Sequence, residues 1–270
     1  MTAPVALARS EVGPFAAALR RFRSRRRMSQ LDLALTCEVS ARHLSFLESG
    51  RAEPSRDMVL RLAEGLLLPL GARNALLQAA GFASVFPASP LDSEALAPFR
   101  AVLDEMIARH APNPALLCDR HWTVLDANPV GRMLLAGLQG VTGEANVVRM
   151  LTRGGGAVAE AVVNLPEVIA ELSARLQLEA LEAGDDPELA ALLGELDEAA
   201  ARHPLRAAPG PRSPLSPLIL RSPLGPLTFL TTIAHFGTSQ DVTVRDLRLE
   251  LLFPADEQTR AAMAALAETL

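Results

Sequence analysis

Side chains that can donate hydrogen bonds are concentrated between Arg25 and Arg51. Arg42, His43 and Ser45 lie within four residues of one another, and their side chains suit the donor and acceptor groups that bases present in the major groove of DNA. The recognition chemistry that these residue types predict is hydrogen bonding to double-stranded DNA.

Two short helices must position these donors. Apolar residues recur at helical spacing on both sides of Glu38, and they predict that the two helices share a core. The core positions are Leu33, Ala34 and Cys37 in the first helix and Leu44 and Leu47 in the second.

Two serines predict where the helices begin. Ser29 can cap the first helix, with Asp32 completing a near capping box, and Ser40 can cap the second, which then starts near Ala41. The few residues between the helices fit only a tight turn, and the pair therefore predicts a helix-turn-helix. A solvated helical hairpin without a ligand is the alternative, because amphipathic helix pairs are common.

Further helices are predicted on either side of this pair. Residues 14–27 form a helix whose arginines, including Arg26 and Arg27, attract phosphate or form a solvated face. Residues 56–67 and 72–80 form the fourth and fifth helices. The predicted class of this part is mainly α, with five helices.

The sequence also resembles a known family of DNA-binding domains. It is similar to the phage-repressor-like, xenobiotic-response-element regulators, whose matching contacts imply that Gln30, Ser40, Ala41 and Arg42 meet DNA. One departure is Glu38, at a turn position usually held by Gly. The resemblance is carried by Ser29-Gln30-x-x-Leu33-Ala34 and Val39-Ser40-x-x-x-Leu44-Ser45-x-Leu47-Glu48-x-Gly50-Arg51-x-x-Pro54-Ser55.

Charge divides the chain into two parts. Residues 1–81 contain 12 Arg against 7 acidic residues, a net charge of +5, whereas the remainder contains 14 Arg against 24 acidic residues, a net charge of −10. A basic part releases counterions from DNA and an acidic part is repelled by it. We expect only the first part, including Arg51, to contact DNA.

Composition predicts a cytoplasmic protein with two domains. The 270 residues exceed one ordinary domain, and no run approaches the ~18 apolar residues that cross a membrane. No export signal is visible at the N-terminus. The predicted division is a DNA-binding domain at residues 9–83, a linker rich in Ala, Ser and Pro at residues 84–98, and a second domain at residues 99–270.

The second domain is predicted to be α+β. Short apolar runs at residues 115–118 and 122–125 predict a β-hairpin, and a helix follows at residues 130–138, which is a PAS-like opening. Helices are expected at residues 95–110, 157–183, 187–201 and 256–270, and further strands at residues 218–221, 227–234 and 242–252.

This half resembles the C-terminal domain of the MmyB-like transcription regulators. The matching motifs are Trp122-x-Val124-x-x-Ala127-Asn128, Phe236-Gly237-Thr238-x-x-Asp241-Val242-Thr243 and Phe253-Pro254-Ala255-Asp256. The resemblance implies a PAS-like domain with a pocket for a small hydrophobic, fatty-acid-like effector.

Trp122, Asn128 and Arg132 are candidates for binding this effector. Each has a simpler alternative. Trp122 suits the core, Asn128 can cap its helix, and Arg132 suits the surface.

Enzyme motifs are absent from the sequence, which has no GxSxG, HExxH or CxxC, and its five histidines lack metal-ligand spacing. We expect no cofactor and no catalytic residues. Three hypotheses remain: an effector-responsive DNA-binding regulator, a DNA-binding protein whose second domain serves only dimerisation or partner contact, and an enzyme with a vestigial binding domain. A homodimer is expected because operators usually contain two half-sites.

Overall fold

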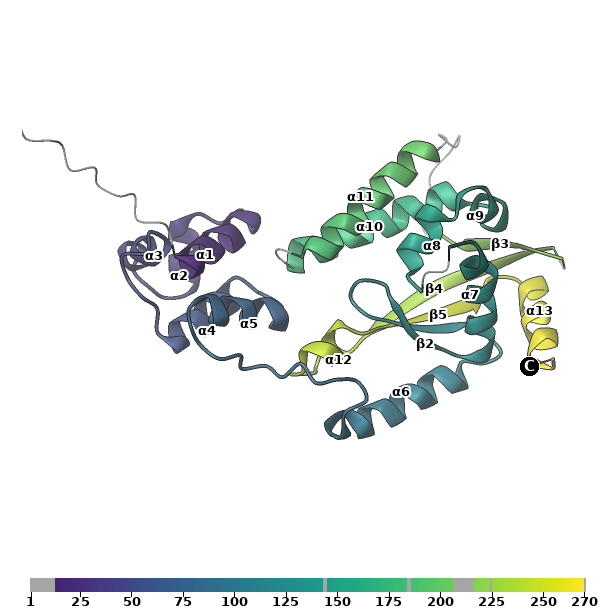
Figure 1. The fold of residues 1–270 in the computed structure, drawn as a ribbon, viewed down its shortest axis with the longest axis horizontal. Helices are drawn as coiled ribbons and strands as arrows, with labels where there is room; N and C mark the ends of the chain where they lie inside the picture. The colour runs from purple at the N-terminus through teal and green to yellow at the C-terminus, as the bar shows by residue number, and fades with distance from the viewer. Residues whose placement is uncertain (1–12, 143–144, 184–185, 206–215, 224, 270) are drawn as a thin grey trace, which may run out of the picture. The chain divides into compact units, whose positions relative to one another are not determined.

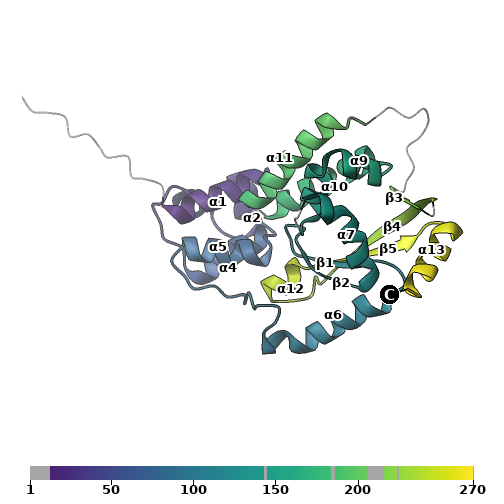
Figure 2. The ribbon, with the colours of Figure 1, turned by 45° about the vertical axis from the view of Figure 1, so that its right-hand side comes forward.

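The computed structural model describes residues 13–142, 145–183, 186–205, 216–223 and 225–269. The chain forms two compact units, the first formed mainly by residues up to Phe86 and the second mainly by residues from Pro87 onward (Figures 1 and 2). This division lies within the stretch predicted as a linker. Among the described helices, none is long and apolar enough to cross a membrane.

The first unit consists of five α-helices, which confirms the predicted mainly α class. α4 ends at Gly65, earlier than predicted, and α5 begins earlier than predicted, directly after Pro69. The five are α1 (Pro14–Arg25), α2 (Gln30–Thr36), α3 (Ala41–Glu48), α4 (Arg56–Gly65) and α5 (Leu70–Ala79).

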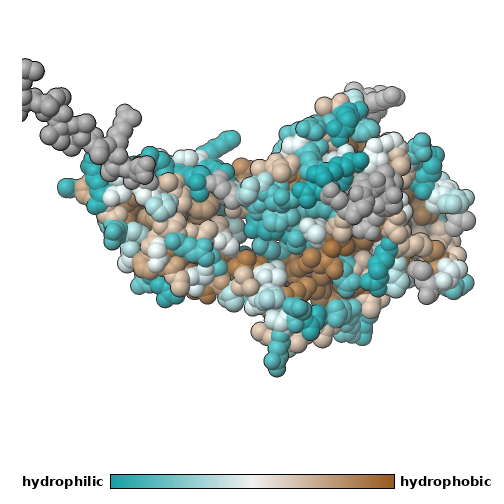
Figure 3. Space-filling view, viewed as in Figure 1, coloured by the Kyte–Doolittle hydropathy of each residue, from teal (hydrophilic) through white to brown (hydrophobic). Residues whose placement is uncertain are grey.

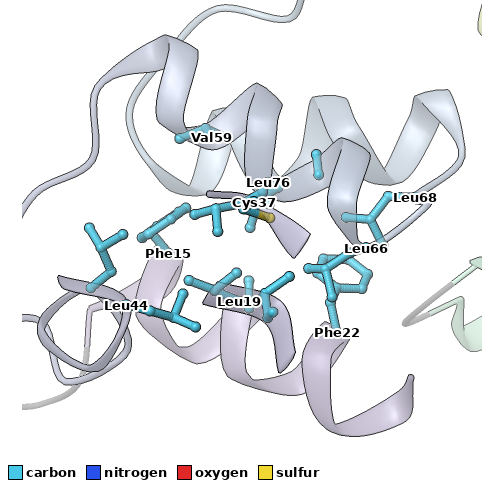
Figure 4. Close-up of a cluster of buried hydrophobic side chains, with 14 of the residues drawn as sticks. Phe15, Leu19, Phe22, Cys37, Leu44, Val59, Leu66, Leu68 and Leu76 are labelled. Atoms are coloured by element: carbon cyan, nitrogen blue, oxygen red, sulfur yellow. The ribbon is translucent and has the colours of Figure 1, made fainter. Parts of the chain in front are cut away.

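The core of this unit is built from aliphatic side chains of every helix. Leu19, Leu33, Leu44, Leu62 and Leu76 are fully buried, and the side chains labelled in Figure 4 point toward one another between the helices. Complete burial of each leucine contributes roughly 1.5–3 kcal/mol. This packing, and not the intrinsic stability of such short helices, holds α2 and α3 in place.

The end of the first unit is tied back to α5. Asn74 is nearly buried, its side-chain oxygen accepts hydrogen bonds from the backbone N–H groups of Val85 and Phe86, and its amide donates to the Phe86 carbonyl at 2.8 Å. The start of the predicted linker is therefore part of the folded unit.

The second unit is α+β, as predicted, and contains a five-stranded antiparallel sheet of order β2-β1-β5-β4-β3. β1 and β5, distant in sequence, pair from Ala115 opposite Leu251 to Cys118 opposite Arg248. The strands are β1 (Ala115–Cys118), β2 (Val124–Ala127), β3 (Leu218–Ser222), β4 (Gly225–His235) and β5 (Arg248–Pro254).

Helices pack on both faces of this sheet. Successive side chains of β1 point to opposite faces, so Leu117 packs with α6, whereas Leu116 and Cys118 pack with α7 and α8. The helices of this unit are the 3-10 helix η1 (Glu94–Leu96), α6 (Ala97–Arg109), α7 (Pro129–Thr142), α8 (Val147–Arg153), α9 (Gly155–Ala161), α10 (Leu165–Ala183), α11 (Pro187–Arg202), α12 (Val242–Asp246) and α13 (Glu257–Ala267).

Not all apolar side chains of this unit are covered. The space-filling view in Figure 3 shows hydrophobic residues at the surface over the sheet. On α6, Val102 and Met106 lie one turn apart and are 54% and 37% exposed. Exposed apolar surface of this kind is a feature of regions that contact partners.

The prediction of one long helix over residues 157–183 is wrong. The helix is interrupted between α9 and α10, where Val162 forms a β-bridge with Leu220 and the backbone N–H of Val163 donates to the Ile219 carbonyl at 2.8 Å. Asn164 accepts from the Ile219 N–H and donates to the Pro217 carbonyl. Pairing with β3 thus replaces the hydrogen bonds that a continuous helix would make.

The prediction of a strand over residues 242–252 is wrong in its first half. Residues Val242–Asp246 form α12, because the carboxylate of Asp241 accepts hydrogen bonds from the N–H groups of Thr243 and Val244 and caps the helix. β5 begins only at Arg248. A local cap here overrides the β preference of the valines.

Candidate nucleic-acid interface and ligand cavity

The helix-turn-helix has the predicted local geometry. Ser29 accepts a hydrogen bond from the Asp32 N–H, and Asp32 accepts from the Ser29 N–H at 2.8 Å, which completes a capping box for α2. Ser40 caps α3 by accepting from the His43 N–H at 3.1 Å. Between the helices, Glu38 has a φ of 53°, a left-handed conformation that favours glycine.

A buried carboxylate joins α1, α2 and α3. Glu48 is only 1% exposed and accepts from Arg23 at 2.6 and 2.9 Å and from the side-chain amide of Gln30 at 2.7 Å. Burial by itself raises the pKa of Glu48, but the hydrogen bonds and positive charge of Arg23 and the bond from Gln30 hold it below the ordinary value. Glu48 therefore stays ionised and fixes α3 relative to the other two helices.

The predicted DNA contacts are distributed over the start of α3 and the segments around it. Ser40, Ala41 and Arg42 are exposed, and His43 and Ser45 are partly exposed. The guanidinium of Arg42 lies 5.4 Å from the ring centre of Phe46. This stacking holds a planar, multidentate donor on the outer face of α3.

The other predicted contacts lie outside α3. Arg27 and Arg51 are exposed, whereas Arg26 is partly exposed and donates to the Leu67 carbonyl at 3.0 Å. Gln30 stands at the start of α2, where its amide nitrogen is already engaged by Glu48. Its side-chain oxygen, an acceptor, and the second N–H of its amide are left for a base.

The second unit contains a cavity of about 100 Å³ between the sheet and the helices α7, α8 and α10. Most of its lining is aliphatic, and the polar lining residues are few. The apolar residues are Leu116, Leu134, Leu135, Val147, Met150, Leu151, Val162, Val168, Leu172, Leu218, Leu220 and Leu252, and the others are Trp122, Glu171, Arg175, Ser216, Thr231 and Glu250.

Charged groups gather in one part of this cavity. Arg175 pairs with Glu171 at 3.0 Å, and its guanidinium lies 5.6 Å from the ring centre of Trp122. Enclosure by protein raises the pKa of Glu250 to about 7, against the opposing influence of Arg175 and with a contribution from Glu171. An aliphatic cavity with one polar end has the composition of a site for an amphipathic small molecule.

Comparison with family models matches both units. Residues 14–76 match a helix-turn-helix domain, and residues 99–266 match the ligand-binding domain of MmyB-like transcription regulators. The chain belongs to the MmyB-like transcription regulators. A search of curated proteins gave no match.

As a member of this family, the protein is a DNA-binding transcription regulator with a ligand-binding domain, as the sequence predicted. The family matched over residues 99–266 is one of transcription regulators. The matched ranges place the helix-turn-helix in the first unit and the cavity in the ligand-binding domain.

The structure places the three predicted effector residues of this MmyB-like regulator differently. Trp122 lines the cavity and is 1% exposed. Its φ of 63° belongs to a turn held by Asp119, whose carboxylate accepts from the N–H groups of His121 and Thr123. The indole Nε1 is buried without a hydrogen-bond partner in the described part of the chain.

Asn128 and Arg132 are not among the residues that line the cavity. Asn128 is buried, accepts from the N–H groups of Ala115 and Gly131, and donates to the Asn113 carbonyl at 2.8 Å. Arg132 is exposed and pairs with Asp126 at 3.0 Å. The simpler alternatives therefore describe these residues: Asn128 caps its helix and Arg132 lies on the surface.

Sequence reasoning missed Glu171, Arg175 and Glu250 as cavity residues. A signal was present, because Glu171 and Arg175 are spaced i and i+4 on a helix with a leucine face, and Glu250 alternates with leucines in a strand. Nothing local indicates that the two faces meet. Glu48 was missed for the same reason, since its partners are 18 and 25 residues away.

Proposed function

We propose that this regulator binds a small hydrophobic, fatty-acid-like effector in the cavity of its PAS-like C-terminal domain, and that occupancy changes its affinity for DNA. The observation that carries the proposal is the cavity, with twelve aliphatic lining residues and a single charged region formed by Glu171, Arg175 and Glu250. Burial of an alkyl chain there contributes about 0.8 kcal/mol for each CH₂ group.

We assign DNA binding to residues 9–83 and effector binding to residues 99–270. In the first domain we assign base contacts to Arg42 and to its neighbours on α3, namely Ser40, Ala41, His43 and Ser45, together with Gln30, and phosphate contacts to Arg26, Arg27 and Arg51. Their exposure at the start of α3 and around it supports this assignment. The protein acts in the cytoplasm on double-stranded DNA.

We also propose a homodimer, because a regulator with one recognition helix per chain reads a two-part operator best as a pair. Val102 and Met106, exposed on α6, offer apolar surface for such an interface.

The test needs an operator and a blocked cavity. Selection of genomic fragments by the purified protein, followed by sequencing, supplies the operator, and mass spectrometry of extracts from the same protein supplies candidate effectors. Binding of the operator is then measured by fluorescence anisotropy with and without effector. We expect the effector to change the affinity of the native protein by about tenfold, which corresponds to about 1.4 kcal/mol of coupling.

A matched pair of variants on α10 separates the cavity from the rest of the domain. Leu172→Phe enlarges a buried lining residue, whereas Leu178→Phe enlarges a residue that is 66% exposed and lies outside the cavity. The response to effector should be lost only in Leu172→Phe. If both variants keep the response, the effector acts outside this cavity. If no candidate changes the operator affinity of the native protein, the alternative is favoured, in which the second domain serves only dimerisation or partner contact.

A further inference from the structure

The charged region of the cavity contains one carboxyl group, that of Glu250, which has no hydrogen-bond partner in the part of the chain that the structure describes. Glu171 and Arg175 neutralise each other at 3.0 Å on α10. Two residues before Glu250 in β5, Arg248 is paired with Glu179 of the same helix at 2.9 and 3.1 Å. Among the described residues, none forms a hydrogen bond with the carboxyl group of Glu250.

Glu250 occupies a position that an apolar residue would otherwise fill. Its pairing partner in β1 is Leu116, and Leu252 follows it on the same face of β5, and both line the cavity. Glu250 is only partly exposed, and a carboxyl group that is held mostly away from water without a hydrogen bond is unfavourable. A group of this kind facing an apolar cavity is explained most simply by a ligand that completes its hydrogen bonding.

The charge balance of the lining selects the polar end of that ligand. With Glu250 ionised, Glu171, Arg175 and Glu250 carry one negative charge in excess, because Arg175 is the only lining cation. An ionised carboxylate would raise this excess to two negative charges, in surroundings that screen charge poorly. A group that donates a hydrogen bond and carries no negative charge completes the hydrogen bonding of Glu250 without this repulsion.

We propose that the cavity takes an aliphatic effector whose polar end is a hydrogen-bond donor without negative charge, an amine or a hydroxyl, and that this end binds the carboxyl group of Glu250. The inference rests on the proposed effector function and names the chemical class within it. The effector then resembles a fatty acid in its alkyl chain but not in its charge.

The affinity for an amine effector depends on whether Glu250 is protonated. Its pKa of about 7 leaves the carboxyl group mostly neutral at pH 6 and mostly ionised at pH 8. The charged and titratable groups around it are Glu171 and Arg175 on α10 and Cys118 and Arg248 on the sheet, and burial raises the pKa of the Cys118 thiol well above its usual range. The lining from α7 and α8 is apolar.

The experiment compares octylamine, octanol and octanoate, all below their micelle concentrations, as ligands of the full chain. Trp122 is the only tryptophan of the sequence and lines the cavity, so its fluorescence reports binding directly. At pH 8 we expect octylamine and octanol each to bind at least tenfold more tightly than octanoate. Octylamine should weaken about tenfold between pH 8 and pH 6, following ionisation of Glu250, and octanol should change little.

Two variants make the result specific to Glu250. Glu250→Gln keeps the shape of the side chain, and we expect it to remove the pH dependence of octylamine binding and the discrimination against octanoate. Glu167→Gln removes the same charge from an exposed position of α10 outside the cavity and should change neither. If octanoate binds the native protein as tightly as the other two, the proposed head group is wrong while the effector function stands. If none of the three binds, the effector function itself fails.

Discussion

At the scale of single residues, Arg42 is the donor best placed to read a base. It is exposed at the start of α3 and its guanidinium is held over Phe46. We expect Arg42→Ala to weaken operator binding by ~1–3 kcal/mol while binding to random DNA changes much less. Anisotropy titrations on both DNAs measure this difference.

A lysine at the same position serves as the control for Arg42. Arg42→Lys keeps the positive charge but loses the planar fork that pairs with guanine, so it should preserve binding to random DNA and still weaken operator binding. Equal losses on operator and random DNA for Arg42→Ala would show that this side chain contacts phosphate and not a base.

Glu48 stabilises the first domain by joining three of its helices. Glu48→Gln leaves the guanidinium of Arg23, which is 14% exposed, without its ionic partner. We expect a loss of about 2–4 kcal/mol in the free energy of unfolding, because one member of a buried pair is removed. Urea unfolding of the full chain, followed by the helical circular dichroism signal, measures the change.

The pH dependence of stability gives an independent check on Glu48. Because its pKa is lowered in the folded state, the ion pair stabilises the fold above the ordinary carboxyl pKa, and this stabilisation is lost as pH falls through the lowered value. The Glu48→Gln variant should therefore lose less stability than the native protein on acidification. Glu53→Gln, at an exposed position, should behave like the native protein.

At the scale of elements, the turn between α2 and α3 contains local backbone strain. Glu38 has a φ of 53°, where a side chain with a Cβ is disfavoured by about 1 kcal/mol. We expect Glu38→Gly to raise the free energy of unfolding by about 0.5–1 kcal/mol, after allowance for the greater freedom of glycine in the unfolded chain. Glu38→Ala keeps the Cβ and should give no comparable gain in the same urea experiment.

Elements whose signals are local could be predicted from sequence. Ser29 and Ser40 each accept a backbone N–H at the helix start that they predicted, because a cap and the amide it binds lie within three residues. The break at Val162 could not be predicted, because the group that replaces its helical bonding is β3, more than 50 residues away. The charged residues of the cavity could not be predicted for the same reason, since α10 and β5 meet only in the folded domain.

At the scale of the whole molecule, the opposite charges of the two parts of the chain bear on DNA binding. The basic residues 1–81 carry a net charge of +5 and the remainder −10, so attraction to phosphate has to come from particular arginines and not from the protein as a whole. The dependence of affinity on salt is set by the number of phosphates neutralised, and it therefore reports how many of these arginines contact phosphate.

In the proposed homodimer, each arginine substitution removes two phosphate contacts, one from each chain. We expect Arg26→Ala to weaken operator and random DNA alike and to reduce the slope of log affinity against log salt by about 2 in a dimer, compared with about 1 in a monomer, because each chain loses one phosphate contact. Arg61→Ala removes the same charge at an exposed position on α4 that is not a predicted contact, and should leave the slope unchanged. A reduction near 1 for Arg26→Ala, together with a monomeric mass of the complex by light scattering, would rule out the dimer, whereas an unchanged slope would remove Arg26 from the phosphate contacts.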